Sequence, residues 1–165
     1  MKHFLVLVLT LILASCVSST STGHHWPGSE DRTVSVRIDP ALAGDSEFIS
    51  AMQQGSAGWT NGSSYVNLDV QVGPCVDPDP CVEVHREPRN GASTQWSIDD
   101  AKHIHHVWMR FDSAPWDYTT LVNVACHELG HALGLDHGNV EGPCQGGSPT
   151  QIDLDNIAAA YSHTD

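Results

Sequence analysis

The sequence HELGHALGLDH at residues 127–137 constrains the fold of this chain more than any other feature. His127 and His131 are four residues apart, so on a helix both imidazoles project from one face, where a single Zn²⁺ can bind both. Gly134 is placed to end that helix in the left-handed conformation and to turn the chain, which returns His137 to the metal. Three protein ligands leave a fourth position open for water, as in catalytic rather than structural zinc sites. The stretch therefore predicts a metal-binding helix that ends in a tight turn.

Glu128 completes the chemistry that this spacing favours. It lies about 100° round the helix from His127, so its carboxylate is a neighbour of the metal rather than an equivalent ligand. From there it can accept a proton from metal-activated water and later pass it to a leaving amine. The opposite face of the helix is apolar and should be buried; it contains Leu121, Val122, Ala125, Leu129, Ala132 and Leu133. The alternative is a structural zinc that only stabilises the fold, in which case Glu128 would have no catalytic role.

The remaining patterns indicate one domain of mixed secondary structure. Alternating apolar residues predict strands over residues 33–38, 65–72, 82–85 and 103–112. Helices are expected from Asp45-Ser46 to Trp59, with a break near Gly55, and then over about 119–133 and about 150–161. Residues 89–93 predict a turn. A few strands followed by helices favour an α+β or mixed architecture.

The N-terminal segment has the pattern of an export signal. After a short basic start, the apolar run over residues 4–14 is too short to span a membrane but suits the apolar core of a signal peptide. The run ends in Leu13-Ala14-Ser15-Cys16, which resembles the bacterial lipobox, so we expect lipidation of Cys16. The chain then divides into a signal peptide at 1–15, a lipidated N-terminus with a flexible tether at 16–32 and a domain at 33–165. An ordinary signal peptide with a secreted product is the alternative.

Composition narrows the partners and the compartment. Twenty acidic residues against seven Lys and Arg give a net charge of −13, which argues against nucleic acid and anionic lipid as partners. Apart from Cys16, four cysteines remain, an even number that fits an oxidising compartment. Of the three pairings, we favour Cys75 with Cys81, which closes a small loop, and Cys126 with Cys144, which ties the metal helix to the next segment. Cysteine ligation of the metal is the poorer alternative, because three histidines already serve.

Residues 127–137 resemble the extended zinc signature of the metzincin metallopeptidases, and Leu-Gly-Leu-Asp-His at 133–137 is similar to its matrixin version. In length, and in the cysteine beside the helix, the chain also resembles the small snapalysin-type members. The resemblance implies a metzincin-like zincin fold of class α+β: a twisted, mostly parallel sheet of about five strands, an active-site helix, a C-terminal helix and a substrate cleft along the edge strand. It implies zinc ligands at His127, His131 and His137. Glu128 would then be the catalytic base of an endopeptidase.

Two departures from the matrixin pattern stand out. The family places a Met in a tight turn beneath the zinc, whereas no Met follows Met109 here and the corresponding segment is 138–148. We hypothesise that a Cys126–Cys144 bridge provides the missing floor. The propeptide cysteine that blocks the zinc in many matrixins also has no counterpart after Cys16 in the tether. We therefore expect no activation by removal of a propeptide.

A second metal ion has weaker support in the sequence. The resemblance implies a structural zinc near His103, His105 and His106, but the further ligands that it needs cannot be placed. We expect instead an exposed edge strand, with one face formed by Ile104, His106, Trp108 and Arg110, and the other by His105, Val107, Met109 and Phe111.

Two further groups of potential metal ligands also have plainer interpretations. His24-His25 falls in the tether and is expected to be unstructured. Asp77 and Asp79 suggest Ca²⁺ but lack a full oxygen cage, so a solvated loop is preferred there.

Taken together, the patterns predict a monomeric zinc endopeptidase that acts on a protein or peptide substrate outside the cytoplasm of a bacterium. It would contact the membrane only through its N-terminal lipid. A non-catalytic surface lipoprotein that keeps the zinc helix as a binding scaffold is the rival, favoured by the missing Met turn and opposed by the intact Glu128. Zinc capture for import would require a His-rich loop beside the site, and residues 138–149 contain no His.

Overall fold

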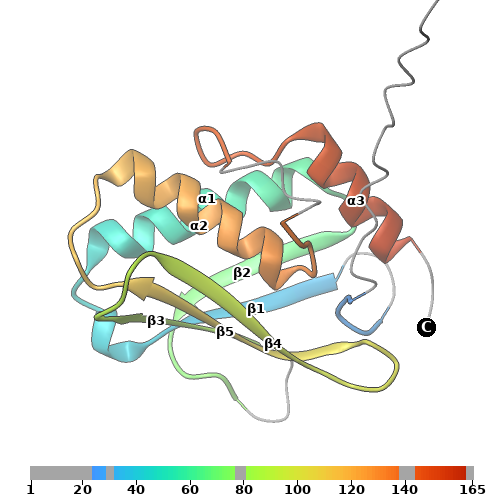
Figure 1. Cartoon of the computed structure of the whole chain (residues 1–165), viewed down its shortest axis with the longest axis horizontal. Coiled ribbons are helices and arrows are strands. Elements are labelled where there is room, and N and C mark those ends of the chain that lie inside the picture. Colours follow the sequence, from blue (N-terminus) through green and yellow to red (C-terminus); the bar gives the residue numbers. More distant parts are fainter. Residues whose placement is uncertain (1–23, 29–31, 77–80, 138–143, 163–165) are drawn as a thin grey trace, which may run out of the picture.

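A five-stranded sheet forms one layer of the molecule in the computed structural model, which describes residues 24–28, 32–76, 81–137 and 144–162. The strand order is β2-β1-β3-β5-β4, and every neighbouring pair is parallel except β4 with β5. The predicted twisted, mostly parallel sheet is therefore confirmed (Figure 1). The strands are β1 (Arg32–Ile38), β2 (Val66–Val72), β3 (Cys81–Glu87), β4 (Ala92–Ile98) and β5 (Ile104–Asp112).

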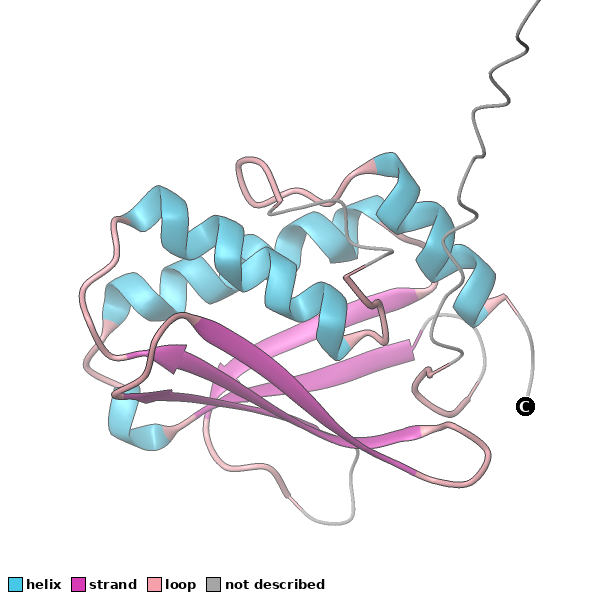
Figure 2. Ribbon diagram, in the orientation of Figure 1, coloured by secondary structure: helices cyan, strands magenta, loops and turns pink. Residues whose placement is uncertain are grey.

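Helices cover one face of this sheet, which we call the inner face (Figure 2). Helices α1 and α2 lie side by side over it, and α3 follows at the C-terminal end. Each begins at a side-chain cap, from Asp45, Asp117 and Thr150 respectively, and Thr150 forms a capping box with Asp153. The helices are α1 (Ser46–Gly62), α2 (Tyr118–Ala132) and α3 (Gln151–Tyr161), and a single 3₁₀ turn spans Pro40–Leu42.

Helix α1 continues through Gly55, so the predicted break there is wrong. A Cβ at Gly55 would lie 2.8 Å from the backbone nitrogen of Cys126 in α2. The glycine therefore allows the two helix backbones to approach closely rather than ending α1. On the same side, the indole N–H of Trp59 donates to the Cys126 carbonyl at 2.8 Å.

Strand β5 lies between β3 and β4, so the expectation of an exposed edge strand is wrong. Its side-chain alternation also breaks, because His105 is an extra residue: Ile98 pairs with Ile104, whereas Ser97 pairs with His106. This bulge turns Ile104 to the buried side, where Val107 also lies, instead of leaving it beside His106. The edge position belongs to β4, which the sequence patterns did not reveal beyond the turn that precedes it.

Residues 24–28 belong to the folded domain, not to a flexible tether. Trp26 is completely buried, and its indole N–H donates to the Ala132 carbonyl at the end of α2 at 2.9 Å. His25 forms a parallel bridge with His103, and its carbonyl accepts from the Ile104 N–H at 2.7 Å. The expectation that His24-His25 is unstructured is therefore wrong, because a Trp beside them reaches the core.

Both disulfides of the favoured pairing are present, Cys75–Cys81 and Cys126–Cys144. The first closes the loop that precedes β3, and Asp77 and Asp79 of that loop lie outside the described residues. In the part of the chain that the structure describes, no helix is long and apolar enough to cross a membrane. The predicted signal peptide and Cys16 lie outside that part.

Candidate metal centre

The C-terminal half of α2 and the turn after it gather the three predicted histidines. One ring nitrogen from each of His127, His131 and His137 lies within 4.8 Å of the other two. The Nε2 atoms of His127 and His131 are 3.1 Å apart. Two nitrogens that each bind a tetrahedral Zn²⁺ at about 2.0–2.1 Å stand at a similar separation, so this pair fits one ion without rearrangement.

The surroundings of His131 select the tautomer that a metal needs. Its Nδ1 lies 2.7 Å from the Leu135 carbonyl, which can only accept, so Nδ1 carries the proton and Nε2 presents its lone pair to the centre. Burial, the largest influence, lowers the pKa of His131 and favours this neutral form. His137, in contrast, has a side chain that is 81 % exposed and closes the centre from the solvent side.

Gly134 forms the turn as the sequence predicts. Its φ of +93° is in the left-handed region, and a Cβ there would collide with the carbonyl oxygen of His24. Glycine is thus required both by the backbone conformation and by the close approach of the N-terminal segment. The Leu135 N–H returns to the Gly130 carbonyl at 3.1 Å, which locks the reversal that leads to His137.

Glu128 points into a hollow beside the histidines. Glu128 is only 6 % exposed, and the hydroxyl oxygen of Thr94 in β4 lies 2.6 Å from Oε2 of Glu128. The hollow has a volume of about 300 Å³ and is lined by Ala92, Ser93, Thr94, Trp96, Glu128, His131, Asp136 and His137. A larger hollow of about 410 Å³ between α1 and residues 146–149 has no ionisable lining residue, so the chemistry belongs to the first.

Three side chains from distant parts of the chain donate to the last carbonyls of α2. Trp96 of β4 donates to His131 at 2.7 Å, and Trp26 of the N-terminal segment donates to Ala132 at 2.9 Å. The hydroxyl of Tyr161 in α3 donates to Leu133 at 3.0 Å. Carbonyls at a helix end lack partners within the helix, so these donors hold the end that carries His131. Sequence reasoning missed Thr94 and the roles of both indoles, because none of them belongs to the motif.

Comparison with known proteins agrees with this geometry. The sequence model of the peptidase family Matrixin matches residues 74–144, which include the whole of the 127–137 motif. Over these residues the chain is similar to the matrixins. No curated protein matches it significantly.

The solved structures that are similar to this chain include one zinc protease. High choriolytic enzyme 1, a hatching-enzyme zinc protease of the medaka fish Oryzias latipes, is 14 % identical over 71 % of this chain and 52 % of its own, with a TM-score of 0.49. Two structures of myroilysin are each 17 % identical; they cover 72 % and 88 % of this chain and 54 % and 68 % of their own, with TM-scores of 0.47 and 0.42. The matrixin-like chain thus spans about half the length of the first two proteins.

The Cys126–Cys144 bridge holds the middle of α2 in this matrixin-like domain. After Cys144 the chain forms a short reversal in which Gln145 pairs with Ser148, and the Gly147 N–H donates to the Asn123 side chain at 3.1 Å. The Asn123 contact lies about one turn before His127, and Cys126 immediately precedes this histidine. The hypothesis that the bridge replaces the Met turn remains a prediction, whereas the end of the helix is held by the three donors described above.

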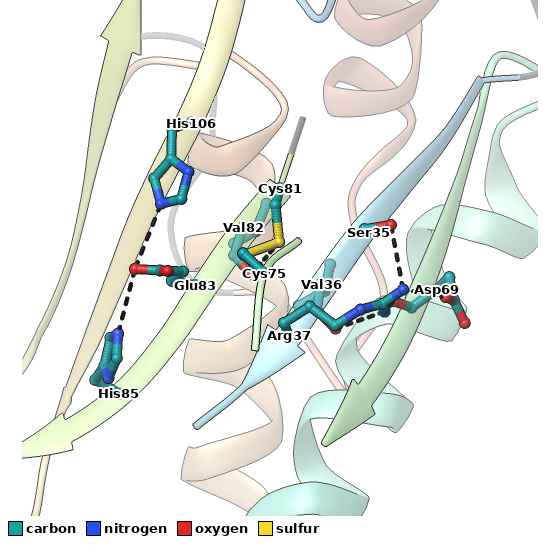
Figure 3. The surroundings of a disulfide bond; sticks show 10 residues. All are labelled: Ser35, Val36, Arg37, Asp69, Cys75, Cys81, Val82, Glu83, His85 and His106. Carbon is teal, nitrogen blue, oxygen red and sulfur yellow. Dashed lines mark hydrogen bonds and ion pairs between the residues drawn. A yellow bond between two sulfur atoms is a disulfide. The ribbon is translucent and has the colours of Figure 1, made fainter. Parts of the chain in front are cut away.

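A second group of histidines lies on the outer face of the sheet, away from the helices (Figure 3). Glu83 lies between His106 and His85, with its Oε2 3.4 Å from one Nε2 and 3.6 Å from the other. The remaining nitrogen of His85 lies 3.0 Å from Asp39. Cys75 approaches Glu83 and His106 closely enough to share a metal, but its sulfur is bonded to Cys81. We call Glu83, His85 and His106 the outer histidine group, and the three α2 histidines the inner histidine group.

Among the described residues, the structure shows no complete ligand set near His103 and His105 for the second zinc that the family resemblance implies. Both rings approach Asp99, at 3.3 and 3.1 Å. Among the described residues, however, neither histidine belongs to a group of three side chains that could share one ion.

Proposed function

We propose that this chain is a zinc-dependent endopeptidase in which His127, His131 and His137 hold the ion and Glu128 is the general base. The observation that carries the proposal is the convergence of three imidazoles beside a hollow that also contains a buried carboxylate. A Zn²⁺ held there would polarise a peptide carbonyl and acidify a water molecule. The match to a peptidase family over residues 74–144 supports the same reaction class.

The chain's own groups account for the proton movements. Glu128 takes a proton from the water that attacks the scissile carbonyl, and then delivers it to the leaving amine as the C–N bond breaks. A protein or peptide substrate would lie extended along β4, whose residues 92–94 line the hollow. Among the described residues, no strand pairs with the outward side of β4, so its backbone can pair with an added strand. We further propose that the enzyme acts as a monomer.

The proposed location is outside the cytoplasm of a bacterium, with Cys16 lipidated after removal of residues 1–15. The apolar run and the Leu13-Ala14-Ser15-Cys16 sequence support this location. Detergent-phase partitioning of the full chain and of Cys16→Ala tests it. Retention of the wild type alone in the detergent phase is expected, and equal partitioning would favour a secreted product.

The function is tested by cleavage of a mixed peptide library by residues 17–165 loaded with Zn²⁺. Glu128→Gln keeps the size of the side chain but cannot act as a base, so it should bind zinc and retain only a small residual rate of cleavage. Cleavage by the wild type that chelation abolishes establishes the endopeptidase and shows its sequence preference. If both proteins bind zinc and leave every peptide intact, the chain is instead the non-catalytic zinc-containing lipoprotein that binds a partner.

Activity should fall as the pH drops below about 6, because protons compete with the metal for the three imidazoles. The bound zinc, measured after gel filtration at each pH, should fall in parallel. A rate that stays constant down to pH 4 would contradict a tris-histidine site.

A further inference from the structure

The hydroxyl of Thr94 makes the shortest contact to Glu128 in the described structure. Oγ1 of Thr94 lies 2.6 Å from Oε2 of Glu128 and 3.2 Å from the Glu128 backbone carbonyl. A threonine hydroxyl has one proton to donate, and both of these oxygens are acceptors. The shorter contact to a charged oxygen is the stronger, so the proton goes to the carboxylate.

Thr94 is held firmly enough to fix its partner. It pairs with Met109 in the ladder between β4 and β5. Two residues further along the same face of β4, Trp96 donates to the carbonyl of His131 at 2.7 Å. Strand β4 therefore contacts α2 at the base and, one turn later, at a metal ligand. The pairing with β5 and the hydrogen bond from Trp96 to His131 together fix the position of Thr94 relative to the inner histidine group.

We propose that Thr94 is a positioning residue that holds the Glu128 carboxylate in its reactive orientation. With Oε2 engaged by the hydroxyl, Oε1 is the oxygen left to take a proton from water. The donated hydrogen bond also stabilises the negative charge of a carboxylate that is only 6 % exposed and would otherwise lose most of its hydration. This inference rests on the proposed function, because it gives Glu128 the role of base.

A purely structural role for Thr94 makes different predictions. If the hydroxyl only ties β4 to α2, its removal lowers stability and leaves the reaction of the folded enzyme unchanged. If it positions Glu128, its removal slows the reaction while folding and zinc binding persist. The loss should also disappear once Glu128 can no longer act as a base.

The test compares Thr94→Val, which keeps the shape and removes the hydroxyl, with Thr94→Ser, which keeps the hydroxyl. Thr33→Val is the control for the same change in another strand, because the Thr33 hydroxyl contacts only the exposed Asn67 at 3.2 Å among the described hydrogen bonds. We expect Thr94→Val to lower kcat about 10–100-fold with little change in KM or zinc affinity. Thr94→Ser should recover most of the rate, and Thr33→Val should match the wild type.

The same substitution in the Glu128→Gln background gives the decisive comparison. There, Thr94→Val should cause no further loss of the residual rate, because the group that it positions is already disabled. An unchanged kcat in Thr94→Val alone would overturn the proposal. A further loss of the same size in the Glu128→Gln background would overturn it as well.

Binding of acetohydroxamic acid separates this proposal from the proposed function. This small chelator binds zinc through two oxygens and can pass a proton to a neighbouring carboxylate, so its affinity reports the position of Glu128 without any substrate. Thr94→Val should weaken its zinc-dependent binding about tenfold, and Thr94→Ser should not. If the wild type binds the probe but cleaves no peptide, the endopeptidase fails while the Thr94 comparison is still decided. Equal affinities in Thr94→Val and the wild type would refute the positioning role.

Discussion

The inner and outer histidine groups contain similar residues and differ in what surrounds them. In the inner group, a backbone carbonyl accepts the Nδ1 proton of His131, and the Nε2 atoms of His127 and His131 face each other. In the outer group, both Nε2 atoms face the Glu83 carboxylate, and Cys75, which among the described residues could share a metal with Glu83 and His106, is in a disulfide. Carboxylates beside imidazoles favour a chain of ion pairs, whereas lone pairs that converge without a shared counter-ion favour a metal. Histidine number alone would not separate the two groups.

The largest effect expected from this comparison is on zinc binding. His131→Ala should abolish binding of one zinc equivalent, because it removes a ligand and opens the centre. His106→Ala in the outer group should leave that equivalent bound. Equilibrium dialysis followed by elemental analysis measures both. Retention of zinc by His131→Ala, or its loss from His106→Ala, would show that the metal lies elsewhere.

Stability should distinguish the two faces in the same way. Trp26 is completely buried and supports the end of α2, so Trp26→Ala should cost about 3–5 kcal/mol. Trp108 is half-buried on the outer face, where its ring lies 4.6 Å from that of His106, and Trp108→Ala should cost about 1–2 kcal/mol. Urea denaturation of both variants gives the free energies. Equal costs would mean that residues 24–28 do not support the domain as the contacts indicate.

The metal helix could be predicted from the sequence because its determinants are local. The i, i+4 spacing of His127 and His131, the apolar stripe on the other face and the left-handed Gly134 all depend on neighbours within one or two turns. The ends of α2 differ from the predicted ones by a single residue each. The mostly parallel sheet followed from the family resemblance rather than from the strand patterns.

The parts that sequence reasoning missed depend on contacts between distant residues. Residues 92–98 carry only two large apolar side chains, Trp96 and Ile98, both in the second half of the segment, so β4 has little alternation and is defined by pairing with β5. Trp26 reaches a carbonyl 106 residues away, and nothing beside it in the sequence indicates burial. Thr94 lies 34 residues before Glu128 on a strand that was not predicted. A threonine in such a segment gives no local sign that it contacts the site.

The two disulfides provide another comparison between the metal helix and the outer face of the sheet, with a smaller expected effect. Cys126–Cys144 spans 18 residues and holds α2, whereas Cys75–Cys81 spans six residues and closes the loop that precedes β3. Restriction of the unfolded chain predicts losses of about 3 and about 2 kcal/mol when each pair is replaced by serine. Thermal denaturation of the two double variants measures the difference. Only the Cys126–Cys144 variant should also lose zinc more readily on chelation, and the reverse order would contradict the assignment of α2 as the metal element.

The smallest predicted effect concerns two indoles that donate to carbonyls of the same helix. Trp96 donates to His131 at 2.7 Å, and Trp59 donates to Cys126 at 2.8 Å. Loss of the hydrogen bond in Trp96→Phe or Trp59→Phe should lower the free energy of unfolding by about 1 kcal/mol, because each carbonyl can still accept a hydrogen bond from water or from a backbone N–H group. Only Trp96→Phe should also weaken zinc binding, by roughly tenfold, since it frees the turn that carries a ligand. Competition with a fluorescent chelator measures the affinity, with Trp59→Phe as the matched control. A similar loss of zinc affinity in both variants would mean that α2 responds as one rigid body. The contact from β4 would then not specifically stabilise the metal-binding end of the helix.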